Sequence, residues 1–182
     1  MYTVRTAESF DTRIVGRLSF LLLVVGCTVS LGASGRLTLR LITDGAVSFA
    51  FLPFFVVAGF AVVYFSRADR PLRFAGALDL FLTGLLPWLL WLLVLDVICS
   101  IVPPRRFGPW IQPLEISLIL PAVWSTVLDF HFFREVMGRV TGAATRDVVL
   151  YRLIGWGGAT TYFLGIAIWY EVVPTALKWI AG

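Results

Sequence analysis

The sequence predicts an all-α protein, a polytopic integral membrane bundle of five transmembrane helices with the N-terminus inside. Five long apolar stretches fill most of the 182 residues, and the charged residues lie mainly between them or at their ends. Hydrophobic residues make up 59% of the chain and charged residues 14%, with a mean hydropathy of +0.89. A soluble domain usually carries about 25% charged residues. These observations indicate that lipid surrounds the helices.

The length of the apolar stretches sets the number of crossings. A hydrocarbon layer of about 30 Å needs roughly 20 apolar helical residues, so five crossings leave little chain for a soluble domain. We therefore expect a single membrane domain over residues 1–182, with short loops. The predicted spans are 14–33, 45–65, 77–102, 111–133 and 148–170, followed by a tail, 171–182, that is too short to cross and is expected at the interface.

Three further features of these spans follow from the sequence. The apolar run of the first span continues past Cys27, so we interpret it as a retained span rather than a cleaved signal peptide. Arg17 lies one turn inside this span, and its long side chain can extend to the interface. The third and fourth spans are joined by a short segment, 103–110, which predicts an antiparallel hairpin.

The basic residues predict the orientation. With the N-terminus inside, ten of the fifteen Lys and Arg residues fall in inner segments and five in outer ones. Inner segments of membrane proteins carry the excess of Lys and Arg. The distribution therefore favours an inner N-terminus and an outer C-terminus.

Three prolines, Pro53, Pro87 and Pro121, fall near the middle of the second, third and fourth spans, at equal intervals and each directly after a leucine. A proline inside a helix frees the carbonyl four residues earlier and kinks the helix. The freed carbonyls belong to Phe49, Thr83 and Ser117. One interpretation is a layer of broken helices around a substrate, as in transporters; the other is ordinary kinked packing, favoured because no charge shares that depth.

Four acids lie at two levels of the predicted hairpin. Asp79 and Asp129 fall near its inner end, where Arg73 and Arg134 are the expected partners; Asp96 and Glu115 fall in its outer half, with Arg105, Arg106 or Trp110 as the expected partners of Asp96. An ionised Asp at a helix centre costs about 2.5–3.5 kcal/mol on insertion scales. These acids are therefore candidates either for an ion or proton site or for structural hydrogen bonds between helices.

Few residues suggest a cofactor or a reaction. His131 is the only histidine, so it could supply one axial haem ligand or simply bond a headgroup or loop carbonyl. Cys27 and Cys99 lie in apolar segments without metal-binding spacing, so we expect no metal site and interpret them as small buried hydrophobes. Motifs of metalloproteases, serine hydrolases and phosphate-binding loops are missing from the sequence. We expect no catalytic residue and no enzymatic activity.

The fifth span carries a face of small residues. Gly158, Thr161 and Gly165 recur at helical spacing. Small residues let the backbone of another helix approach closely, and such packing drives association within membranes. The partner could be another span of this chain or another protein.

The stretch Trp124–Leu128, followed by Phe133–Gly138, resembles the region between the fourth span and the following loop of Yip1-domain proteins. The resemblance covers about 30 residues. That family is similar also in having five spans and a cytoplasmic N-terminus. It implies a non-enzymatic role in membrane organisation or trafficking, and it implies no catalytic residue.

Taken together, these features favour a non-enzymatic multi-pass membrane protein, a subunit or scaffold of a larger membrane assembly. The expected partners are membrane lipids and other membrane subunits; nucleic acid is not expected, because the chain has no basic tail. Two alternatives stay open: a small proton or cation transporter or channel that uses Asp96 and Glu115, and a pigment- or haem-holding subunit that uses His131.

Overall fold

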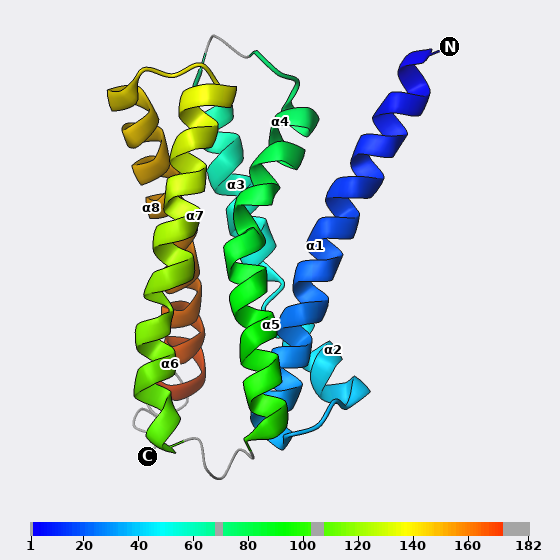
Figure 1. Cartoon of the computed structure of the whole chain (residues 1–182), viewed down its shortest axis with the longest axis vertical. Coiled ribbons are helices and arrows are strands. Elements are labelled where there is room, and N and C mark those ends of the chain that lie inside the picture. Colours follow the sequence, from blue (N-terminus) through cyan, green and yellow to red (C-terminus); the bar gives the residue numbers. More distant parts are fainter. Residues whose placement is uncertain (1, 68–70, 103–107, 173–182) are drawn as a thin grey trace, which may run out of the picture.

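The computed structural model describes residues 2–67, 71–102 and 108–172, and every element in these ranges is helical. The chain is an all-α helical bundle, as predicted, and Figure 1 shows α1 leaning away from the other helices toward its N-terminus. The α-helices are α1 (Tyr2–Ser34), α2 (Leu39–Ser48), α3 (Phe51–Phe65), α4 (Phe74–Phe81), α5 (Leu86–Ile101), α6 (Ile111–Ser117), α7 (Ile119–His131) and α8 (Thr141–Ala167). Short turns complete them: the 3₁₀ turns η1 (Leu82–Leu85) and η3 (Gly108–Trp110) and the π turns η4 (Phe132–Val136) and η5 (Ile168–Val172).

Four helical stretches are long and apolar enough to cross a membrane: Thr12–Ser34, Leu39–Phe65, Phe74–Ile101 and Ile111–Val136. They contain most of the first four predicted spans and fit a multi-pass membrane protein. Large apolar side chains point outward from them; Phe54 is 66% exposed and Leu120 is 71% exposed. Such exposure is expected where lipid, rather than water, surrounds a helix.

Helix α8 covers the predicted fifth span but is not among these four stretches. It contains Arg146, Asp147 and Arg152 together with several glycines, which lower its mean hydropathy. At 27 residues it is about 40 Å long, enough to cross a bilayer. The fifth crossing and the inner N-terminus stay predictions. The predicted interfacial tail lies outside the described residues from position 173 onward.

Each of the three prolines begins a new helical segment. Pro53, Pro87 and Pro121 lie in the first turns of α3, α5 and α7, directly after an interruption of the preceding helix. At two of the breaks, the freed carbonyl accepts a hydrogen bond from a nearby backbone N–H. The Phe49 carbonyl accepts from the N–H of Leu52 at 3.0 Å, and the Thr83 carbonyl accepts from the N–H of Leu86. In each case the donor is the residue just before the proline, so a tighter turn satisfies the carbonyl that lipid cannot.

Two glycines hold α1 and α2 together as a close hairpin. A Cβ atom on Gly26 would lie 2.4 Å from the carbonyl oxygen of Ile42, and one on Gly45 would lie 2.8 Å from the Cβ of Val29. No larger residue fits at either position without separating the helices. The hairpin turns at Gly35, whose φ of 67° is in the left-handed region that ends many helices.

An aromatic core joins α3, α4, η4 and α8. The ring of Phe60 stacks on Phe81 with 4.6 Å between centroids, and Phe81 meets Tyr151 edge-on at 4.8 Å. Phe132 and Phe133 from η4 close the same cluster, which is almost completely buried. This core lies toward the end of the bundle formed by the last turn of α3, the first turn of α4, η4 and the first turn of α8 (Figure 1), here called the inner end because the sequence predicts it to face inward.

Candidate functional site

Three aspartates are buried in the inner half of the bundle, and each has an arginine partner. Asp79, Asp129 and Asp147 are 7%, 4% and 1% exposed. A buried carboxylate is costly unless a cation and hydrogen bonds compensate it. The three pairs together, here called the arginine–aspartate layer, connect all the long helices at this end.

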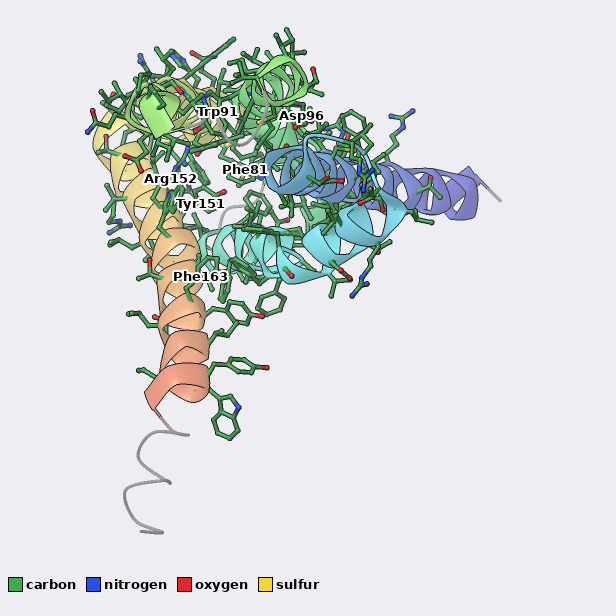
Figure 2. The ribbon with its side chains drawn as sticks, turned by 90° about the horizontal axis from the view of Figure 1, so that it is seen from below. Phe81, Trp91, Asp96, Tyr151, Arg152 and Phe163 are labelled. Carbon is green, nitrogen blue, oxygen red and sulfur yellow. The ribbon has the colours of Figure 1, made fainter. Side chains whose placement is uncertain are left out.

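The pair between Arg152 and Asp129 links α8 to α7. Arg152 Nη2 donates to Asp129 Oδ2 at 2.6 Å and to Ser125 Oγ at 2.8 Å. The Trp88 indole donates to the same Ser125 hydroxyl at 3.0 Å, so α5 joins the network. Figure 2 shows Arg152 and Tyr151 extending from α8 toward Phe81 in the middle of the helices. Arg152 is one of the ten basic residues predicted in inner segments, and its guanidinium lies inside the bundle rather than in a loop.

Asp79 pairs with Arg17 of α1. Arg17 Nε lies 3.3 Å from Asp79 Oδ1, and the same guanidinium donates to the main-chain carbonyl of Asp79. This pair fixes α1 against α4, and beyond it the N-terminal part of α1 leans away from the bundle (Figure 1). Arg17 therefore uses its length to reach a neighbouring helix rather than the interface alone.

The prediction that Arg73 and Arg134 pair with the inner acids is wrong. Both are exposed, and the acids are paired with Arg17 and Arg152 instead. The reason is their position: Arg73 precedes α4 in extended backbone, and Arg134 lies in η4 beyond the end of α7, so neither side chain belongs to the helical face that carries the acid.

Asp147, the most buried of the three, was not singled out from the sequence. It pairs with Arg67 after α3 and lies 3.8 Å from Nε of Arg139. Burial lowers the pKa of the Arg67 guanidinium, and the neighbouring Arg139 and Arg146 lower it further. In the sequence, Arg146 and Asp147 look like an ordinary pair of solvated charges beside a loop. The burial of Asp147 becomes evident only from the packing of α8 against α3.

Asp96 lies on α5 on the side facing α1 (Figure 2), close to Cys27, Thr28 and Cys99. Within the described residues it has no arginine partner, and its Oδ1 is buried without a hydrogen bond. The Thr28 hydroxyl is near enough to interact, but it donates its single proton to the Val24 carbonyl at 3.0 Å. Of the partners expected from sequence, Arg105, Arg106 and the Trp110 side chain lie outside the described residues.

The remaining predicted residues are separated from this layer. Glu115 is exposed on α6, and no contact with Asp96 is found in the part of the chain that the structure describes. On α8, Gly158 packs inside the chain, where a Cβ atom would lie 2.4 Å from Phe55. Thr161 and Gly165 are exposed, and the space around Gly165 is open.

Two hollows lie along the hairpin of α4–α5 and α6–α7. The larger is an apolar groove of about 420 Å³ between α5 and α6–α7, lined by Pro87, Pro121, Trp91 and Trp124 among others. Across it, the Trp91 indole donates to Ser117 Oγ at 2.9 Å. The smaller, about 210 Å³, lies at the inner end beside Asp129 and His131.

His131 is half-exposed at the edge of the smaller hollow. Its Nδ1 lies 2.9 Å from Oε1 of Glu135, one turn along the chain. Among the residues that the structure describes, no three His, Cys, Asp or Glu side chains come close enough to hold a metal ion. Haem binding by His131 stays a prediction.

The chain matches no family model, no curated protein and no solved structure. Membership of the Yip1-domain family therefore stays a prediction.

Proposed function

We propose that this chain is a non-enzymatic subunit or scaffold of a larger membrane assembly. The observation that carries the proposal is a row of small residues on α8, Gly157, Thr161 and Gly165, spaced four apart. All three are exposed, and a Cβ atom at either glycine would meet nothing within 4 Å. Rows of this kind are where membrane helices pack closely against one another.

The surroundings of the small residues on α8 support this assignment. The Phe55 ring of α3 occupies the space beside Gly158. The chain therefore already uses one small residue of α8 for its own packing. The row of Gly157, Thr161 and Gly165 is exposed, and no described segment of the chain covers it. A helix from another subunit is the partner that such a surface fits best, because lipid chains gain nothing from close backbone approach.

The arginine–aspartate layer supports the same function. Asp79, Asp129 and Asp147 each have an arginine neighbour within the chain. A carboxylate held by a cation is a poor carrier of a transported ion, whereas ion pairs between helices keep a bundle in one arrangement. A rigid body with a small-residue face is what a scaffold requires.

The test replaces the row with leucine. Gly157→Leu/Gly165→Leu is expected to release the chain from its complex after extraction in mild detergent, measured by size-exclusion chromatography and quantitative mass spectrometry of co-purifying proteins. Gly32→Leu is the matched control, since Gly32 is also a helical, exposed glycine with open space around it. A wild-type chain that elutes as a monodisperse monomer would contradict the proposal.

A second function, proton or cation transfer, is favoured by one observation. The Asp96 carboxylate has a buried oxygen without a partner among the described residues, and such intramembrane acids often serve transport. Liposome flux of wild type and Asp96→Asn decides this. Flux that Asp96→Asn abolishes supports transport; equal flux in both chains, or none in either, removes it.

A further inference from the structure

The smaller hollow, here called the inner cavity, lies between α4–η1 and α7–η4 and measures about 210 Å³. Its polar lining consists of Thr83, Asp129, His131 and Glu135, and the rest is apolar or glycine: Leu80, Phe81, Gly84, Leu128, Phe132 and Val136. Neither Arg nor Lys is among the described residues that line it. The lining therefore carries two acids, and the cation nearest to Asp129, Arg152, binds it from outside the lining.

Asp129 presents an unused acceptor to this cavity. Its side chain is only 4% exposed, and Arg152 binds Oδ2. Oδ1 receives no hydrogen bond within the described part of the chain, and it faces Gly84, where a Cβ atom would lie 2.9 Å from it. Both residues line the cavity. Oδ1 is not fully enclosed by protein, so a donor that enters the cavity can reach it and form a charge-assisted hydrogen bond.

Two further acceptors line the same cavity. The Thr83 hydroxyl donates to the Leu80 carbonyl, which leaves the lone pairs of its oxygen available. Glu135 uses Oε1 for His131, which leaves Oε2. Together with Asp129 Oδ1, the cavity thus offers three available acceptor oxygens, which equals the number of N–H donors of a primary ammonium group.

We infer that the inner cavity binds the ammonium group of a primary amine, with the Asp129 carboxylate as its principal partner. The aromatic wall suits such a ligand, because the rings of Phe81 and Phe132, 5.3 Å apart, can face a cation and a short alkyl chain. A divalent metal ion fits less well, since hard cations need six or more oxygen ligands. The ammonium group could belong to a free amine or to an aminophospholipid headgroup, because the cavity lies where α7 ends, at the predicted inner boundary. The inference does not depend on the assembly role.

The experiment uses the full chain in lipid nanodiscs and isothermal titration calorimetry. Ethylammonium chloride is titrated into nanodiscs of phosphatidylcholine alone, with sodium chloride at equal ionic strength as the reference. The same titration is repeated in nanodiscs that contain phosphatidylethanolamine. Saturable ethylammonium binding in both discs identifies a free amine as the ligand; binding that phosphatidylethanolamine suppresses identifies the lipid headgroup.

Four variants test which residues bind it. Asp129→Asn should weaken ethylammonium binding more than tenfold, since it removes the principal charge. Gly84→Ala should abolish binding without changing any charge, because the new methyl occupies the space beside Oδ1. Glu135→Gln, at the exposed edge, should weaken it about two- to fivefold, the range of an exposed ion pair. Glu115→Gln, an equal change of charge on exposed α6, should leave binding unchanged.

Glu135→Gln keeps the inference testable if Asp129→Asn or Gly84→Ala fails to fold, because Glu135 is exposed and outside the core. The inference is overturned if ethylammonium shows no saturable binding and phosphatidylethanolamine does not co-purify with the chain in native mass spectrometry. It is overturned equally if the folded Asp129, Gly84 and Glu135 variants bind ethylammonium as tightly as wild type.

Discussion

At the scale of single residues, the buried charges show most clearly how this chain tolerates a lipid surrounding. Asp129 and Arg152 lie opposite one another inside the bundle, and Ser125 accepts hydrogen bonds from both Arg152 and Trp88. The hydroxyl also donates to the Ala122 carbonyl at 3.2 Å. One small side chain thus satisfies two donors that apolar neighbours could not.

Removal of one member of this pair should be strongly destabilising. Arg152→Gln leaves the Asp129 carboxylate buried without its cation, at a cost of about 3–5 kcal/mol in unfolding free energy. Denaturation of the detergent-solubilised chain, followed by circular dichroism, measures the change. Arg40→Gln is the control: the exposed Arg40–Asp44 pair, 3.8 Å apart, should contribute no more than about 1 kcal/mol. Equal losses of unfolding free energy in both variants would show that burial does not determine how much the Arg152–Asp129 pair contributes to stability.

A second prediction at this scale concerns Gly138, which has a φ of 64° and lies two residues after the end of η4. An L-residue in this conformation costs roughly 1–2 kcal/mol, so Gly138→Ala should lower the melting temperature. Gly142, in the first turn of α8, has open space and no such φ. Gly142→Ala should therefore raise stability slightly, because alanine favours the helix. A melting temperature for Gly138→Ala at or above that of Gly142→Ala would contradict the argument.

At the scale of helices, the prolines and glycines set where each element begins and how closely it packs. The interruptions before Pro53, Pro87 and Pro121 divide three spans into shorter helices. Pro87 and Pro121 line the same apolar groove, so the two breaks lie across from each other in the hairpin. The breaks follow from local chemistry and could be placed from the sequence, whereas the groove depends on how α5 meets α6 and α7.

The contact between α3 and α8 yields a prediction with a neighbouring control. A Cβ atom at Gly158 would lie 2.4 Å from the Phe55 ring, whereas one at Gly157 would meet nothing within 4 Å. Gly158→Ala should therefore destabilise the bundle by roughly 1–3 kcal/mol, as overpacking usually does. Gly157→Ala should be neutral or slightly stabilising. Thermal unfolding of both variants measures the difference. Similar melting temperatures would contradict the close contact of Gly158 with Phe55.

At the scale of the whole molecule, the arginine–aspartate layer and the aromatic core occupy the same half of the bundle. The layer links α1 to α4, α7 to α8, and the end of α3 to the start of α8. The other half is joined by glycine packing between α1 and α2, by the Trp91–Ser117 hydrogen bond along the hairpin, and by ring contacts between α3 and α8, where Phe51 stacks on Tyr162. We expect the inner half to be the more rigid one, because removing any charged partner there is costly.

The topology of the chain is the prediction at this scale. In a chain with Cys27 and Cys99 replaced by alanine, single cysteines at Arg36 and Tyr170 should react with an impermeant maleimide added outside intact cells. Cysteines at Ser66 and Thr141 should react only after permeabilisation. All four positions are exposed in the structure. If the cysteine at Tyr170 were protected together with those at Ser66 and Thr141, α8 would not cross the membrane.

Much of this architecture follows from the order of residues along the chain. The length of the apolar stretches predicts the first four spans, the prolines predict where the spans are interrupted, and the short segment 103–110 predicts that the third and fourth spans form a hairpin. Each of these features depends on residues close together in the sequence. The partners of the buried acids do not follow in this way. Arg17, Arg67 and Arg152 reach aspartates on other helices, and their pairing depends on which helix faces which. These pairings are decided only when the helices pack, because the local sequence around a charged residue does not determine which residue of another helix will lie beside it.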